Sequence, residues 1–211
     1  MTETNAIVSS PSILAEFTGG SSGDVEMMIG VGIVKDSDAV FFQYMGDDQQ
    51  PVALVLPNSG KPLTRLSNVT LAGVAVAEDV GEFNATKLNV YLRSSSGRTI
   101  MLTSGLTTIW SQCVMTSLAG LVNTDLVDST FQLDSWKGTA KLKPRFAAVR
   151  VGGAKISDQL MYDALREARG DGDKAKVERI QRDAIDVVTA ALGGPIEQAE
   201  VAVANDEEAP F

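Results

Sequence analysis

Short runs of β-forming residues alternate with turn residues through the first half of the chain. The runs cover residues 27–34, 39–45, 52–56, 69–77, 87–93 and 98–103. Clusters of Asp, Asn, Ser, Gly and Pro lie between these runs. Runs of this length bounded by such residues are typical of β-strands. Their regular spacing predicts a barrel or a sandwich of short strands.

The hydrophobic period changes once, in the middle of the chain. Over residues 107–121 apolar side chains, Trp110 among them, recur every three or four positions, which predicts a helix with Trp110 in the core. Strand-like runs resume at 130–137 and 145–151. Strands, one helix and further strands in this order are expected of an OB-type Greek-key barrel, in which a helix lies between the third and fourth strands. We therefore predict a mainly β, OB-like barrel over residues 27–155, with the earliest strands as an elaboration.

Two amphipathic helices are expected near the end of the chain. Ser157 can cap the first helix and Asp173 the second, and glycines follow both. Together they predict an α-helical hairpin over 156–192, whose apolar stripes pack on the barrel in preference to a second copy of the chain. The polar residues 1–26 predict a flexible N-terminal arm, and the small and acidic residues 193–211 predict a disordered acidic tail.

Residue counts narrow the range of functions. The chain has 211 residues and no histidine, which excludes Ser-His-Asp triads, imidazole acid/base catalysis and histidine metal ligands. The single cysteine, Cys113, excludes an intramolecular disulfide and any multi-cysteine metal site. No stretch approaches the ~18 apolar residues of a membrane span, and the first residues lack the pattern of a secretory signal. We therefore expect a cytoplasmic protein that is not an enzyme and has no membrane segment, metal site or cofactor.

Charge is distributed unevenly along the chain. The whole chain has a formal net charge of −9, yet residues 87–155 carry nine basic and three acidic side chains. Residues 193–211 carry five acidic side chains and no basic one. A basic segment followed by a purely acidic end indicates a polyanion-binding surface and a tail that competes with polyanions for it.

The predicted strand at 87–93 shows the pattern expected of a nucleic-acid-binding surface. Because successive side chains of a strand point to opposite faces, the even-numbered residues enter the core and the odd-numbered ones share an outer face. That outer row is Lys87, Asn89, Tyr91 and Arg93. Cations neutralise phosphates and exposed rings stack on bases. Tyr91 is therefore the first candidate for stacking.

A second basic stretch follows at 136–145, where four cations accompany Trp136. In an OB-type barrel the loop between the last two strands borders the binding face. The pattern leaves open whether Trp136 stacks on bases or belongs to the core. The complete set of predicted nucleic-acid-binding residues is Lys87, Asn89, Tyr91, Arg93, Arg98, Trp136, Lys137, Lys141, Lys143, Arg145 and Arg150.

The chain ends in Asp-Glu-Glu-Ala-Pro-Phe. This ending resembles the C-terminal tip of bacterial and phage single-stranded DNA-binding proteins, in which several acids precede a Pro-Phe terminus. The family uses the tip as a docking peptide whose terminal ring fills an apolar pocket on a replication or repair enzyme. Ala209 stands where the family prefers a larger aliphatic residue, so the nearer resemblance is to divergent phage or plasmid members. The resemblance implies a partner-docking role for Asp206, Glu207, Glu208, Pro210 and Phe211.

These observations predict sequence-independent binding and protection of single-stranded DNA in replication, recombination and repair. The tip would recruit replication or recombination enzymes, and the chain could form a homo-oligomer. One alternative is a phage or plasmid structural or assembly protein that oligomerises through its helical hairpin and binds no nucleic acid. Another is a metal-dependent nuclease using Glu78, Asp79 and Glu82, although three acids in a turn more often form a solvated corner.

Overall fold

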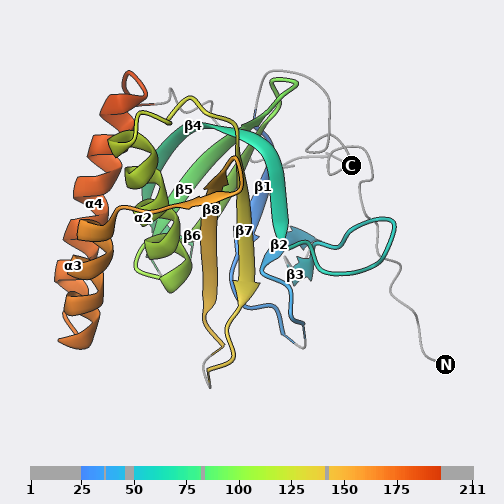
Figure 1. Cartoon of the computed structure of the whole chain (residues 1–211). Coiled ribbons are helices and arrows are strands. Elements are labelled where there is room, and N and C mark those ends of the chain that lie inside the picture. Colours follow the sequence, from blue (N-terminus) through green and yellow to red (C-terminus); the bar gives the residue numbers. More distant parts are fainter. Residues whose placement is uncertain (1–24, 36, 46–49, 82–83, 141–142, 196–211) are drawn as a thin grey trace, which may run out of the picture.

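The computed structural model describes residues 25–195, apart from 36, 46–49, 82–83 and 141–142. Most of the expected arm and most of the expected acidic tail therefore lie outside the described residues. The described strands form one nine-stranded mixed sheet in the order β3-β2-β1-β6-β5-β4-β7-β8-β9. The sheet curls on itself, and the helices gather on one side of it (Figure 1). The prediction of a mainly β protein with a helical hairpin is confirmed.

Each predicted run overlaps one element, but β3 shares only two residues with the run 52–56, and β4 extends beyond the run 69–77 at both ends. The strands before the central helix are β1 (Val25–Val31), β2 (Phe41–Met45), β3 (Gln50–Ala53), β4 (Arg65–Val80), β5 (Ala85–Ser94) and β6 (Thr99–Gly105). The later elements are α2 (Ile109–Asn123), β7 (Phe131–Lys137), β8 (Arg145–Val151), β9 (Ala154–Ile156), α3 (Gln159–Gly170) and α4 (Lys174–Ala191). The short strand β9 was not expected, because its three residues carry no detectable period.

The long strand β4 connects the two parts of the sheet. Its first residues pair with β7, from Arg65 opposite Asp134 to Val69 opposite Phe131, and the rest of it pairs with β5. The register shifts between Leu66 and Val69, where Asn68 has a φ of +56°. Asparagine tolerates this left-handed conformation better than most residues, and such irregularities bend a strand. Figure 1 shows β4 arching over the molecule between its two partners.

The three earliest strands extend this same sheet. β1 pairs in parallel with β6, with Met28 opposite Met101, and antiparallel with β2, which in turn pairs with β3. Phe42 of β2 is 8% exposed and meets Tyr44 edge to face, with ring centroids 5.2 Å apart. The expected elaboration is therefore a three-stranded addition at the free edge of β6.

Helix α2 lies in the interior, between the sheet and the helical hairpin. Thr108 caps its start by accepting a hydrogen bond from the Ser111 backbone N–H. Trp110 is 1% exposed, and its indole N–H donates to the Ser135 hydroxyl of β7 at 3.0 Å. The prediction that Trp110 belongs to the core is confirmed. A helix buried on most of its sides anchors the sheet and the hairpin to one another.

The hairpin of α3 and α4 packs on its own chain. Its stripe of buried residues includes Leu165, Val177 and Val188, and α4 contacts both α2 and β4. The side chain of Arg182 on α4 donates to Glu78 on β4 at 2.6 Å. Asp158, one residue after the expected Ser157, caps α3, since its carboxylate accepts from the Met161 N–H. No described helix combines the length and hydropathy that a membrane span requires.

Candidate nucleic-acid interface

The centre of the predicted binding row on β5 is buried. Tyr91 is 6% exposed and Asn89 is 9% exposed. β5 is paired on both sides, and β1 adds a strand beyond β6, so that the register places Met101 beside Tyr91 and Met28 beyond it. Burial raises the pKa of Tyr91, and a hydrogen bond with Asn89 offsets only part of that rise. The expectation of an exposed stacking ring at Tyr91 is therefore corrected.

The two cations of that row lie at its ends. Lys87 is half-buried opposite Gly105 and Arg93 is exposed near the β5–β6 turn. That turn is closed by backbone hydrogen bonds between Ser94 and Arg98 and between Gly97 and Ser94. Arg98, half-buried, follows the turn directly. The β5–β6 tip thus carries cations, and the exposed rings of the described residues, Tyr44, Trp136 and Tyr162, belong to other elements.

A stacked aromatic pair close to basic side chains lies on β7 and β8. Trp136 is 44% exposed, and its ring stacks on that of Phe146 with centroids 5.9 Å apart and an angle of 21° between the planes. The two residues face each other across the β7–β8 pair. Gly138 lets the chain pass beside Phe146, since a Cβ there would lie 2.6 Å from the ring. The open question about Trp136 is therefore answered in favour of the surface.

Two arginines share one carboxylate, that of Asp134, two residues before Trp136 on β7. Asp134 accepts from Arg65 of β4 at 2.7 Å and from Arg150 of β8 at 3.0 Å. The amide of Gln132 donates to it as well, at 2.9 Å. Partial burial acts to raise the pKa of Asp134, but the hydrogen bonds from these three side chains outweigh it and hold the pKa below its ordinary value. The carboxylate fixes both guanidinium groups on the same face as Trp136.

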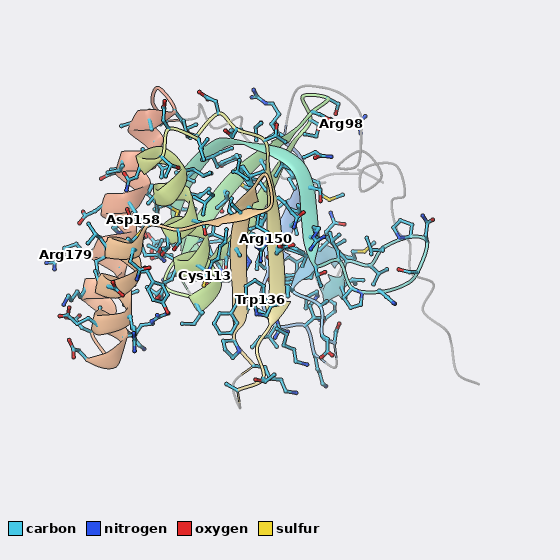
Figure 2. The ribbon with its side chains drawn as sticks, in the orientation of Figure 1. Arg98, Cys113, Trp136, Arg150, Asp158 and Arg179 are labelled. Atoms are coloured by element: carbon cyan, nitrogen blue, oxygen red, sulfur yellow. The ribbon has the colours of Figure 1, made fainter. Side chains whose placement is uncertain are left out.

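We call the surface formed by Arg65, Asp134, Trp136, Phe146 and Arg150 the β7–β8 platform. Strand alternation places Asp134 and Trp136 on one face, and the register places Phe146 and Arg150 beside them. The two arginines and the one aspartate give it a net charge of +1. In Figure 2 the labelled Trp136 and Arg150 lie along these strands, while Arg98 lies at the far end of the sheet.

The basic side chains at residues 137–145 have different surroundings. Lys137 forms an ion pair with Asp38, and its pKa is lowered by loss of hydration and by the nearby charges of Lys143 and Arg145. Lys143 is exposed. Arg145 is 5% exposed and donates to the backbone carbonyls of Gly32, Ala39 and Lys143, so its charge stabilises the fold. Lys141 and the acidic tip, Asp206, Glu207, Glu208, Pro210 and Phe211, lie outside the described residues.

Three residues of the platform, Arg65, Asp134 and Phe146, were missing from the sequence prediction. Phe146 follows a proline in a basic stretch and carries no signal of its own until its partner Trp136 is known. Arg65 is isolated in the acidic part of the chain, and only the β4–β7 register brings it to Asp134. A pairing between distant strands cannot be deduced from local pattern.

The acidic group considered for a metal does not gather in the described residues. Glu78 accepts from Thr86 at 2.9 Å as well as from Arg182, and its pKa is lowered, chiefly by the hydrogen bond from Arg182. Glu82 lies outside the described residues. The part of the chain that the structure describes holds no cluster of three metal-ligating side chains.

The chain was compared with protein families, with curated proteins and with solved structures. No family model, no curated protein and no solved structure matches this chain. The functional assignment therefore rests on the side chains of the β7–β8 platform and on their surroundings.

Proposed function

We propose that this protein binds single-stranded DNA without sequence preference, through the β7–β8 platform. The observation that carries the proposal is the half-exposed Trp136 ring, stacked on Phe146, on the same face as Asp134 and the two arginines that it binds. A flat ring beside fixed cations is what a single strand requires, because every base has a π-face and every nucleotide has a phosphate. A Trp–Phe pair of which one ring remains 44% exposed leaves aromatic surface for a base.

The order of the strands favours an OB-like scaffold, in an open form in which β6 pairs outward with β1 and β8 pairs outward with β9. β4 pairs with both β5 and β7, β6 follows β5, β8 follows β7, and α2 is inserted between β6 and β7. Five strands with one helix between the third and the fourth agree with the order proposed from the sequence. In this interpretation four platform residues lie on the last two strands and Arg65 lies on the first, and β1, β2 and β3 are added at the edge of β6.

The charges of the platform set the expected binding mode. Arg65 and Arg150 neutralise phosphates, and the exposed Lys143 extends the positive surface beyond β7. Release of counterions from the DNA makes such binding weaken as salt increases. The acidic residues 193–211 compete for the same cations, and their Pro-Phe tip docks on replication or recombination enzymes. The protein protects single strands and is not itself an enzyme.

A titration of fluorescent oligo-dT, followed by anisotropy at low and moderate salt, tests the proposal. Trp136→Ala should weaken binding by about 5- to 150-fold, because a stacked base contributes about 1–3 kcal/mol. Tyr162→Ala is the matched control, since Tyr162 is a 43% exposed ring on α3 and should bind as the wild type does. Arg150→Gln should reduce the slope of log affinity against log salt by about 0.7.

Further arms of the titration address the tail and the preference for single strands. A chain ending at residue 192 should bind more tightly at low salt, since the competing acids are gone. A duplex of the same length should bind more weakly than oligo-dT. Equal loss of affinity in Trp136→Ala and Tyr162→Ala, or an absence of binding even at low salt, would contradict the proposal.

The assembly-protein alternative makes the opposite prediction. It expects no retention on single-stranded DNA resin together with a stable oligomer in size-exclusion chromatography. The hairpin stripe that it needs for oligomerisation is occupied in this structure by α2 and β4 of the same chain. That packing favours DNA binding over assembly as the first proposal.

A further inference from the structure

A cavity lies on the helical side of the molecule. It has a volume of about 300 Å³ and is lined by the segment leading into α2, the end of α3 and the start of α4. Its walls include Ile109, Gln112, Arg169, Asp173, Lys174 and Val177, and no residue of the β7–β8 platform. This volume is within the range of cavities that bind small molecules. We call it the helical cleft.

Gln112 gives the helical cleft an unusual polar wall. The side chain is 3% exposed, and its Nε2 donates to the Thr107 carbonyl at 2.8 Å. Because a carbonyl can only accept, this bond fixes which end of the amide is nitrogen. The Oε1 atom is left as one of two buried side-chain polar atoms without a hydrogen-bond partner among the described residues. Buried acceptors are nearly always satisfied, so this oxygen calls for a ligand that donates an N–H or O–H.

The charged residues of the helical cleft favour an anionic group on the same ligand. Arg169 and Lys174 both line it, and neither forms an ion pair or side-chain hydrogen bond among the described residues. Asp173 is engaged as the cap of α4, where its carboxylate accepts from the Lys176 N–H at 2.8 Å. Two cations and one anion leave the lining with a net charge of +1. The remaining walls, Ile109 and Val177 among them, are apolar.

We propose that the helical cleft binds a nucleoside monophosphate, independently of DNA binding at the platform. Its phosphate would meet Arg169 and Lys174, for which the described residues supply no ion-pair partner. An N–H group of its base would donate to Gln112 Oε1, and the flat ring would cover the apolar wall. A free phosphate offers no base donor, and a nucleoside offers no charge, so each should bind much more weakly than the whole nucleotide.

Calorimetric titration of the full chain with dTMP, thymidine and inorganic phosphate tests this proposal. Wild type should bind dTMP, and Arg169→Gln combined with Lys174→Gln should weaken that binding by at least about tenfold, the effect of losing a hydrogen bond to a charged group. Arg166→Gln is the matched control, because Arg166 is an exposed cation of α3 outside the cleft. Trp136→Ala should also leave dTMP binding unchanged, which separates the cleft from the platform.

The side-chain amide resonances of Gln112 provide a readout that does not depend on charge. They should shift in an NMR titration with dTMP and stay unchanged with phosphate alone. The proposal is overturned if dTMP does not bind at millimolar concentration, if phosphate alone binds equally well, or if the Arg166→Gln control loses as much affinity as the double variant. Loss of dTMP binding in Trp136→Ala would assign the nucleotide to the platform and would also overturn it.

Discussion

Gly120 lies in the last turn of α2, where the chain leading into α3 crosses the helix. A Cβ atom at this position would lie 2.8 Å from the Ser157 carbonyl carbon and 2.9 Å from the Asp158 nitrogen. Both contacts are backbone atoms, so no side-chain rotation can relieve them. The Asp158 N–H also donates to the Thr116 carbonyl at 2.9 Å, and its carboxylate caps α3. Gly120→Ala should therefore push the crossing segment away from α2.

The sign of this effect follows from two opposing magnitudes. Replacing a helical glycine by alanine gains about 0.5–1 kcal/mol from the lower entropy of the unfolded chain. Overpacking in a closely packed interior costs about 1–3 kcal/mol, and a weakened backbone hydrogen bond adds about 1 kcal/mol. The net expectation is a loss of about 1–3 kcal/mol in the free energy of unfolding. For a chain of this length each kcal/mol lowers the Tm by about 2–4 °C.

Urea unfolding followed by circular dichroism measures this difference. Gly170→Ala is the control, since Gly170 ends α3, has no positive φ, and has no atom within 4 Å of an added Cβ. That variant should be as stable as wild type or more stable by up to about 1 kcal/mol. Wild-type or greater stability in Gly120→Ala would refute the steric reasoning.

Two further predictions concern buried polar contacts. Trp110→Phe should lower the free energy of unfolding by about 1–3 kcal/mol, because it leaves the Ser135 hydroxyl without its donor. Adding Ser135→Ala to this variant should recover part of the lost stability in urea unfolding. If no stability is recovered, the role of this hydrogen bond is contradicted. Asp134 has a folded-state pKa below its ordinary value of 3.8, so its contribution to stability is complete above that value and is lost as the pH falls through the lowered pKa. Asp134→Asn should therefore be less stable than wild type near neutral pH, and the gap measured by urea unfolding should narrow below about pH 4; a gap that is constant with pH would contradict this.

Local pattern was enough to predict the helices and most strands. Helical spacing alone predicts that Trp110 belongs to the core, and Trp110 is buried in α2. The same rules misplaced Tyr91, because alternation identifies the face of a strand and not what surrounds that face. The packing of other side chains against that face decides its burial, and alternation does not reveal it.

Arg145 shows a second limit of reasoning from sequence. Its basic neighbours suggested a phosphate contact, yet three backbone carbonyls satisfy its guanidinium in the interior. Two of these carbonyls belong to Gly32 and Ala39, far away in the chain. Conversely, Arg65 and Phe146 joined the platform through strand pairing alone. Charge density along a chain therefore locates a surface only approximately.

The parallel pairing of β1 with β6 has a consequence for how the protein acquires its structure. β1 leaves the ribosome before β2, β3, β4 and β5, but it has no partner for its inner edge until β6 is complete. The antiparallel hairpins from β4 to β6 close short loops and can form first, whereas joining β1 requires closing a long one. The apolar residues Met27, Ile29 and Val31 remain unpaired during that interval. Newly made chains are therefore most prone to aggregate between the synthesis of β1 and the completion of β6. A chaperone that covers β1 would act during that interval.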